Sequence, residues 1–503
     1  IPADWTAALH SDLATSAPVL LLGSQSGENR LLFAVSEAMR PVKIKAGVHE
    51  ETCEAACSVE LFTCPEAPIA AYELLLRLDI RPLFYAEAIR EAFGWLASFP
   101  EYEAAAVPPA AYEPFYSSWY SFHQNLFAPE LERECALAAR YGMKGVIIDD
   151  GWQTDDNRRG YAFCGDWEIS ERRFPDMRAH VERVHRLGMK YLVWFSVPFM
   201  GDRSRNRERF GGKFLYRLEE LGTAVLDPRF PEVREFLIST YEKALVQWDI
   251  DGFKLDFIDS FRFDGEDPAV REDYACRDLR SLPEAVNLLL SETRTRQERI
   301  KPGILIEFRQ SYIGPAIRKY GNLFRVGDCP GDFLSNRLGV IDLRLTSGDT
   351  AVHSDMLEWN SRDTVENAAL QLLNVIFSVP QISVRLADLP EEHREMLKFW
   401  LDFMRVHQEV LLHGKLTPYH PELNYPLVVA ETETEMVIAV YGGDLAVPVP
   451  PRPGKCCWII NGSGSDRLLL ELPLPVRQAV CFDAAGRQSP GAPPVAGLSR
   501  VRL

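Results

Sequence analysis

Two charged residues interrupt an apolar stretch of the chain that runs from Gly252 to Ile258. They are Lys254 and Asp256, and their spacing of two places both side chains on the same face of a β-strand. An ammonium group beside a carboxylate favours the ionised carboxylate, which is the form that acts as a nucleophile. The pair therefore indicates that this strand has a chemical role.

Charged residues also end three other apolar, strand-like runs. These residues are Asp149 and Asp150, Glu307 and Arg309, and Arg325 followed by Asp328. For any one pair alone, a salt bridge or a helix cap is the plainer interpretation. Four pairs at comparable positions favour a shared site, because the carboxyl ends of parallel strands meet at one edge.

Tryptophans accompany these charged positions. Trp119, Trp152 and Trp194 lie at expected strand ends, and Trp167 lies in a following loop. Aromatic rings stack on the apolar face of a sugar, while carboxylates and cations bind its hydroxyl groups. Each tryptophan alone is explained as well by a place in the core, but together with the charges they predict a carbohydrate site.

Helix–strand units that recur along the middle of the chain would position these residues. Predicted helices at 130–141, 177–187 and 233–248 each lead into an apolar strand, and further apolar runs follow at 304–308 and 323–326. Alternating helices and apolar strands predict an α/β fold with a parallel sheet. The number of units favours a (β/α)8 TIM barrel, over residues 111–408.

Segments of different composition flank this predicted barrel. Residues 1–110 contain short strand-like runs and end in a stretch rich in proline and alanine, which predicts an N-terminal all-β domain, sandwich-like, and a linker. Residues 409–503 alternate apolar runs with turns, which predicts a C-terminal β-sandwich.

The composition excludes several classes of partner. The 503 residues carry a net charge of −17, which repels nucleic acids and anionic membranes. Residues 367–384 are uncharged, but amide side chains and a proline interrupt them, so a buried helix and strand are expected rather than a membrane span. The ten cysteines have no metal-ligand spacing and are expected to be reduced thiols of a cytoplasmic protein. No signal peptide is visible; the chain begins at Ile1, so a trimmed leader or a missing upstream segment stays open, as does homo-oligomerisation.

The motifs resemble those of family 36 of the glycoside hydrolases, whose known members are largely α-galactosidases; family 27 is more distantly similar. Five stretches carry the resemblance: Asp149-Asp150-Gly151-Trp152-Gln153; Gly165-Asp166-Trp167 with Phe174-Pro175; Leu187-Gly188-Met189-Lys190 before Trp194-Phe195; Val225-Leu226-Asp227 before Val233-Arg234; and Ser118-Trp119-Tyr120. They cover most of the predicted barrel, and their order along the chain also agrees with the family.

The resemblance implies roles for individual residues. Asp256 would be the nucleophile and Asp328 the general acid/base of a retaining α-galactosidase, with carboxyl oxygens roughly 5 to 6 Å apart. Burial and repulsion by Asp256 are expected to keep the proton on Asp328. The remaining residues would bind the substrate: Trp119, Asp149, Asp150, Trp167, Trp194, Lys254, Glu307, Arg309 and Arg325. The substrate would be an oligosaccharide or glycoconjugate, and neither a metal nor an organic cofactor is implied.

Several alternatives stay open. Asp332 also follows a plausible turn and is a second candidate for the acid/base, whereas Asp259 is expected to be a rim or cap residue. Glu307 and Arg309 replace a cysteine- and glycine-containing stretch of the family, so another α-linked sugar such as N-acetylgalactosamine is an alternative substrate. His353 either lines the site beside Asp355 or is a structural histidine. A metal-dependent barrel hydrolase and a non-catalytic carbohydrate-binding barrel are the competing classes.

Overall fold

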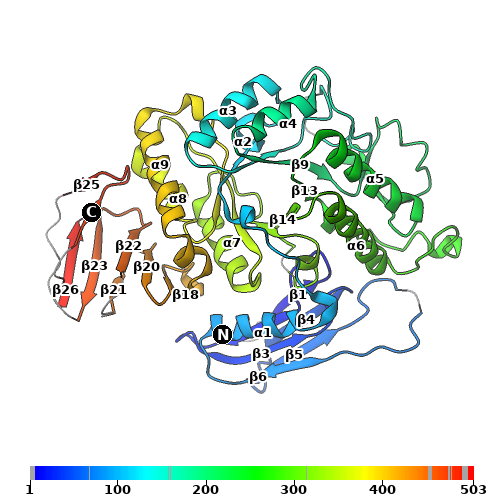
Figure 1. Cartoon of the computed structure of the whole chain (residues 1–503). Helices are drawn as coiled ribbons and strands as arrows, with labels where there is room; N and C mark the ends of the chain where they lie inside the picture. The colour runs from blue at the N-terminus through cyan, green and yellow to red at the C-terminus, as the bar shows by residue number, and fades with distance from the viewer. Residues whose placement is uncertain are drawn as a thin grey trace.

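Eight parallel strands form a closed barrel at the centre of the molecule. The computed structural model describes residues 6–66, 68–156, 158, 160–312, 314–443, 445–450, 456–473, 476, 479–489 and 497–502. The barrel order is β13-β14-β15-β16-β17-β7-β8-β9 (Figure 1). Its strands are β7 (Phe115–Ser117), β8 (Gly145–Ile148), β9 (Lys190–Ser196), β13 (Gly252–Asp256), β14 (Leu305–Arg309), β15 (Leu323–Arg325), β16 (Ala351–Leu357) and β17 (Val379–Ile382). The predicted TIM barrel is confirmed.

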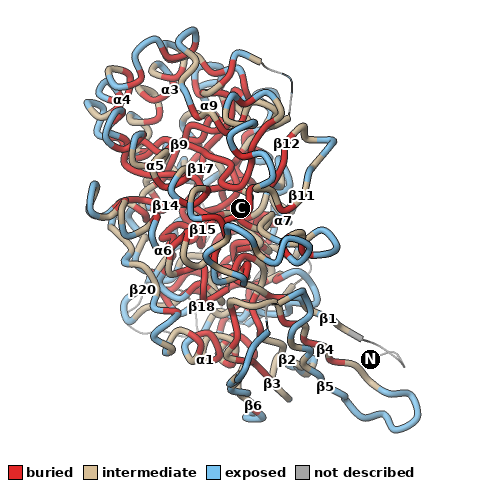
Figure 2. Tube along the Cα trace, turned by 90° about the vertical axis from the view of Figure 1, so that its right-hand side faces the viewer, coloured by how far each residue is buried: buried red, intermediate tan, exposed pale blue. Residues whose placement is uncertain are grey.

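The barrel strands are apolar because both of their faces are buried (Figure 2). Alternate residues form a layer of their own, made of Phe115, Ile147, Leu192, Leu305, Leu323 and Ala351. Their neighbours, such as Val193 and Phe253, join the larger core cluster instead. Gly252 begins β13 because a Cβ there would lie 2.0 Å from the carbonyl oxygen of Leu305 on the adjacent strand.

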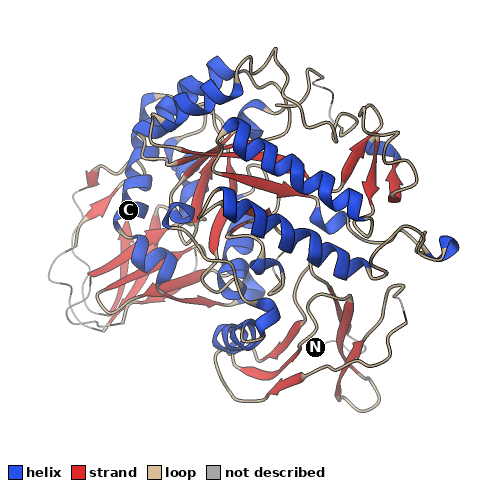
Figure 3. Cartoon of the chain, turned by 45° about the vertical axis from the view of Figure 1, so that its right-hand side comes forward, coloured by secondary structure: helices blue, strands red, loops and turns tan. Residues whose placement is uncertain are grey.

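Helices connect these strands and cover the barrel (Figure 3). They are α2 (Trp119–Phe122), α3 (Ala128–Arg140), α4 (Met177–His185), α5 (Pro231–Trp248), α6 (Leu282–Ile300), α7 (Phe333–Thr346), α8 (Val365–Leu373) and α9 (Glu391–Val406). The Asp176 carboxylate caps α4 by accepting a hydrogen bond from the Ala179 amide. Within the described ranges, no helix has both the length and the apolarity to cross a membrane.

The N-terminal part consists of two small sheets and a helix. The sheets are β1-β4-β5, from β1 (Thr6–Ser11), β4 (Val42–Val48) and β5 (Ala55–Glu60), and β2-β3-β6, from β2 (Val19–Gly23), β3 (Asn29–Val35) and β6 (Leu76–Asp79). Phe33 and Ile44 share the core between the two sheets. The expectation of an all-β segment is wrong in one respect, because α1 (Tyr85–Ala97) covers the other face of β3. Ala88 and Ala92 of this helix pack on Leu32.

Two sheets also form the C-terminal part, drawn in orange and red in Figure 1. One is β18-β19-β20-β22, from β18 (Lys415–Tyr419), β19 (Leu427–Glu431), β20 (Glu435–Val440) and β22 (Cys456–Asn461). The other is β21-β23-β26, from β21 (Ala446–Pro448), β23 (Arg467–Leu472) and β26 (Gly497–Arg502). Ile438 of the first sheet and Leu470 of the second share one core, as in the predicted sandwich.

A buried ion-pair network fastens the long loop that follows β13. The Arg229 guanidinium is fully buried and donates hydrogen bonds to Asp227 and to Asp267 of that loop, at 2.7 to 2.9 Å. A small sheet, β10-β12-β11, precedes Asp227; its strands are β10 (Phe199–Gly201), β11 (Phe214–Leu218) and β12 (Thr223–Leu226). Arg229 therefore ties this insertion to the segment after Asp256.

Replacing Arg229 with methionine should lower the free energy of unfolding by about 3 to 5 kcal/mol, because the buried Asp267 carboxylate loses its counter-charge and Asp227 keeps only that of Arg277. Urea unfolding at neutral pH measures this. Arg271→Met is the matched control, since the Arg271–Glu266 pair is 82% and 84% exposed and should contribute little. Equal destabilisation by the two substitutions would contradict the assignment.

Candidate functional site

Asp256 ends β13 with its carboxylate held by three donors. Arg309 Nε and the Phe257 amide donate to Oδ1 at 2.6 and 2.8 Å. Trp194 Nε1 donates to Oδ2 at 3.1 Å. Burial by itself raises the pKa of Asp256, but the charges of Arg309 and Lys254 outweigh it, so the pKa is lowered and the carboxylate is ionised.

Lys254 lies two residues earlier on the same strand and pairs with the carboxylate that ends β8. Its ammonium group is 2.5 Å from Asp149 Oδ2, and both side chains are buried. Burial disfavours the ammonium charge, but the charge of Asp149 is near enough that the pKa of Lys254 is raised. The Asp149 backbone amide donates a hydrogen bond to Oγ of Ser118, directly after β7, at 2.9 Å.

Asp150 is held by side-chain amides. Gln124 Nε2 and Gln153 Nε2 each donate to its carboxylate at 2.6 Å. Burial raises the pKa of Asp150 to about 6, although both amide donors oppose that rise. The double-aspartate motif thus places one carboxylate on Lys254 and the other on neutral donors.

Arg325, at the end of β15, is surrounded by three carboxylates. Its Nη2 donates to Asp328 Oδ1 at 2.8 Å, and its Nη1 donates to Asp355. Its Nε lies 3.5 Å from Glu307 Oε1. Arg325, Glu307 and Asp355 are all fully buried. Glu307, predicted to bind substrate, therefore lies below the rim, where Gln381 Nε2 donates to its other oxygen.

Asp328 lies at the exposed end of this network, with 54% of its side chain accessible. Burial alone would raise its pKa, but the charges of Arg325 and Lys254 dominate and hold the pKa well below its usual range. The expectation that burial and repulsion by Asp256 keep this carboxyl protonated is therefore wrong for the ligand-free protein. The Arg325 guanidinium beside it is the reason.

The two alternative aspartates have structural roles. Asp332 caps α7: its Oδ1 accepts hydrogen bonds from the Leu334 and Ser335 amides at 3.0 Å. Asp259 accepts a hydrogen bond from the Tyr312 hydroxyl at 3.0 Å. Within the described ranges, neither carboxylate makes a hydrogen bond or ion pair with Asp256, Lys254 or Arg325, and the first is engaged by backbone amides as a helix cap requires.

The predicted tryptophans form a packed cluster beside Asp256. Trp152 Nε1 donates to the Trp194 carbonyl at 2.9 Å, and the Trp152 and Trp167 rings are stacked with centroids 6.0 Å apart. Trp152, Trp167 and Trp194 are buried, so the bulk of these rings is core, and Trp194 reaches the site through its indole nitrogen. Trp119 is half-buried and lies edge-on to His123.

Sequence reasoning missed Tyr161 and the contact between Arg309 and Asp256. The Tyr161 ring stacks on Trp194 at 6.1 Å and meets Phe257 edge-on at 5.0 Å. Burial and the charge of Asp256 raise its pKa, so its hydroxyl stays a donor. No motif marks Tyr161; its loop position gives no signal in the sequence.

Strand β16 carries Asp355, which was named beside His353 in the sequence; it lies two residues after that histidine and so shares its face. Tyr120 and the Cys329 amide donate to Asp355 Oδ2 at 3.0 and 2.7 Å. His353 is structural: burial lowers its pKa to about 4, and its Nε2 lies 2.7 Å from the Ala111 carbonyl. Of the two open interpretations of His353, the structure supports the structural one.

Replacing Arg325 with methionine should destabilise the protein by about 3 to 5 kcal/mol at neutral pH, because three carboxylates lose one guanidinium. Asp328 has a lowered pKa, so its contribution to stability is present above the unfolded pKa and is lost as the pH falls. The deficit of the variant should therefore shrink toward about pH 4, where free carboxyls take up protons. Urea unfolding across pH, with the exposed Arg405→Met as control, measures this; a deficit independent of pH would contradict it.

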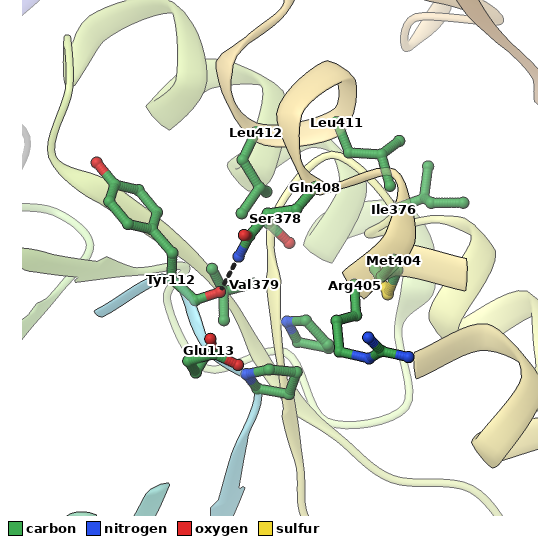
Figure 4. Close-up of a pocket in the computed structure, with 12 residues that line it drawn as sticks. Tyr112, Glu113, Ile376, Ser378, Val379, Met404, Arg405, Gln408, Leu411 and Leu412 are labelled. Carbon is green, nitrogen blue, oxygen red and sulfur yellow. Dashed lines mark hydrogen bonds between the residues drawn. The ribbon is translucent and has the colours of Figure 1, made fainter. Parts of the chain in front are cut away.

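A separate cavity lies at the opposite end of the barrel. Tyr112, Ser378, Val379 and Gln408 are among its lining residues, and Gln408 Nε2 donates to the Tyr112 carbonyl at 2.8 Å (Figure 4). Tyr112 precedes β7 and Val379 begins β17, so this cavity is at the amino-terminal ends of the strands, where barrels carry stability rather than chemistry. None of the predicted site residues lines it. Within the described ranges, no group of three or more His, Cys, Asp or Glu side chains is arranged to hold a metal ion.

Two curated proteins are similar to parts of the chain, and no family model matches it. Over 155 residues the chain is 29% identical to "Probable alpha-galactosidase G" of Emericella nidulans, which is 28% of this chain and 21% of that protein. Over 92 residues it is 28% identical to the bifunctional α-galactosidase/sucrose kinase AgaSK of Mediterraneibacter gnavus, 18% of this chain and 9% of that protein. The match thus spans about a fifth of the first relative.

Solved structures of family 36 α-galactosidases share the fold. AgaB from Geobacillus stearothermophilus has a TM-score of 0.64 at 15% identity, over 85% of this chain and 61% of that one. An AgaA variant from the same organism, in complex with 1-deoxygalactonojirimycin, has a TM-score of 0.68 at 14% identity, over 100% of this chain and 72% of that one. The chain is thus similar in fold to family 36 α-galactosidases and shorter than these relatives.

Proposed function

We propose that this chain, whose barrel is similar to those of family 36 α-galactosidases, is a retaining glycoside hydrolase that removes terminal α-linked galactose from oligosaccharides or glycoconjugates. One observation carries the proposal. Asp256 is an ionised carboxylate at the carboxyl end of β13, and Asp328 reaches the surface after β15, two strands further round the barrel. The names of the two curated relatives, both α-galactosidases, support galactose as the sugar that is removed.

In the first step, an oxygen of Asp256 attacks the anomeric carbon while the bond to the leaving oxygen breaks. Asp328 gives that oxygen a proton, and the product is a galactosyl ester of Asp256. Asp328 is ionised in the ligand-free protein because it pairs with Arg325. It must therefore take up a proton before this step, and substrate binding that draws Arg325 away from it would favour that uptake.

In the second step, water attacks the anomeric carbon and the bond to Asp256 breaks. Asp328 accepts the proton of the water, and the electron pair of the broken bond returns to the Asp256 carboxylate. The paired Asp328 carboxylate is already in the state that a base requires. Two displacements at one carbon leave the released galactose with the α configuration of the substrate.

The remaining residues bind and orient the sugar. Asp149 and Lys254 form a buried pair whose free lone pairs and protons suit galactose hydroxyl groups, and Asp150 supplies a second carboxylate. Variants of AgaA have been solved with raffinose and with stachyose, so these oligosaccharides are the first natural substrates to assay.

A panel of nitrophenyl glycosides tests the proposal. The wild-type protein should release nitrophenol from the α-galactoside, and should do so much less from the β-galactoside and the α-glucoside. The α-N-acetylgalactosaminide tests the alternative sugar directly. Hydrolysis of none of them, or a preference for the β-galactoside, would reject the proposed function.

A further inference from the structure

The two oxygens of Asp256 have unequal surroundings. Oδ1 accepts one hydrogen bond from the Arg309 guanidinium at 2.6 Å and another from the Phe257 amide at 2.8 Å. Among the residues that the structure describes, Oδ2 accepts a hydrogen bond only from the indole N–H of Trp194, and at 3.1 Å this is the longest of the three. One oxygen is thus bound by a charge-assisted and a backbone donor, and the other by a single neutral donor.

Arg309 is itself held in place. Its Nη1 donates to the Gln310 carbonyl at 3.2 Å, and its guanidinium carbon lies 5.3 Å from the Phe257 ring centroid and 5.7 Å from that of Tyr312. Only 20% of its side chain is exposed. A guanidinium in contact with two rings is restrained in its direction toward Asp256, as a positioning group must be.

We infer that Arg309 is a positioning residue which makes Oδ2 of Asp256 the attacking atom and stabilises the carboxylate when it departs in the second step. This inference rests on the function proposed above. It also revises the sequence-based expectation for Arg309, which was that of a sugar ligand.

The two oxygens of Asp256 differ in the galactosyl ester, and this difference favours Oδ2 as the attacking atom. When Asp256 forms the ester, one oxygen is bonded to the anomeric carbon and becomes a poor acceptor, while the other becomes a carbonyl oxygen and remains a good one. Attack through Oδ2 sacrifices only the long hydrogen bond from Trp194. Attack through Oδ1 would weaken the bonds from both Arg309 and Phe257, and would leave a charged donor near an ester oxygen.

The positive charge of Arg309 should affect the rates of the two steps in opposite directions. In the first step Asp256 loses its negative charge, so the guanidinium stabilises the reactant more than the ester. In the second step the bond between the anomeric carbon and Oδ2 breaks and the charge returns to Asp256, so the guanidinium stabilises the leaving carboxylate. Removing the guanidinium should therefore slow the second step relative to the first.

Rapid-mixing kinetics of Arg309→Gln with dinitrophenyl α-galactoside test this effect. The expected result is a burst of about one nitrophenolate per protein, followed by a kcat reduced roughly 10- to 100-fold, with KM falling in parallel. Arg309→Lys, which keeps the charge, should recover part of kcat. An Arg309→Gln protein that shows no burst and loses kcat and kcat/KM by the same factor would overturn the inference.

A structure of the trapped galactosyl-enzyme would show which oxygen of Asp256 attacks, without any substitution at Arg309. Wild-type protein would be reacted with a 2-deoxy-2-fluoro-α-galactosyl donor and its structure solved. The inference expects the anomeric carbon on Oδ2, with Arg309 Nε and the Phe257 amide still on Oδ1. A bond through Oδ1 would overturn it and leave the proposed function standing, whereas a wild type that neither hydrolyses α-galactosides nor becomes labelled would refute the function itself.

Discussion

Replacing Asp256 with alanine will abolish hydrolysis of α-galactosides, with kcat/KM reduced by about 10⁴-fold or more, because the covalent step has no nucleophile. Arg309 and Trp194 both donate hydrogen bonds to the Asp256 carboxylate, which the substitution removes. Initial rates with a nitrophenyl α-galactoside measure the loss.

Azide makes this experiment diagnostic. In a retaining enzyme that lacks its nucleophile, azide enters the vacated space and gives a galactosyl azide of β configuration. We expect azide to restore nitrophenol release by Asp256→Ala and to yield that product. Asp259→Ala is the matched control, because Asp259 lies three residues further on and contacts Tyr312. If Asp259→Ala loses activity and Asp256→Ala retains it, Asp256 is not the nucleophile.

Replacing Asp328 with asparagine will slow hydrolysis of raffinose by about 10² to 10⁴-fold, since its leaving group needs a proton. Dinitrophenyl galactoside, whose leaving group does not, should be affected far less in the first step. Asp332→Asn is the matched control and should keep both its activity and its helix cap, because an asparagine side-chain oxygen can accept the same amide hydrogen bonds. If Asp332→Asn instead shows the dependence on the leaving group, Asp332 is the acid.

Protonation of Asp328 should also determine how the kcat/KM of the wild-type protein depends on pH. The pKa of Asp328 is lowered by Arg325, so its protonated form is lost as the pH rises. We therefore expect kcat/KM for raffinose to fall as the pH increases through the acid range, and kcat/KM for dinitrophenyl galactoside to change less over that interval.

The barrel could be predicted because its signals are local and repeated. Helices α3 and α5 begin within two residues of the predicted positions, at Ala128 and Pro231, where proline lies in the first turn. The strand ends followed from these positions, whereas the ion pair of Lys254 with Asp149, and not with Asp256, was not predicted. Helix α1 was missed because Ala88 and Ala92 pack on a small sheet whose existence depends on distant pairing.

The contacts within the site could not be predicted in the same way. Arg309 and Asp256 are on adjacent strands, but their side-chain contact depends on how the rings of Phe257 and Tyr312 confine the guanidinium. The ionised state of Asp328 depends on the direction in which Arg325 points among three carboxylates. Spacing along a strand gives the face of a side chain, and not its partner.

The configuration of the first product tests the central claim most directly. Proton NMR would follow wild-type protein with a nitrophenyl α-galactoside, and would record the anomeric signal before mutarotation equilibrates it. Two displacements through Asp256 predict that α-galactose appears first. β-Galactose as the first product would contradict the retaining mechanism and the role of Asp256 as its nucleophile.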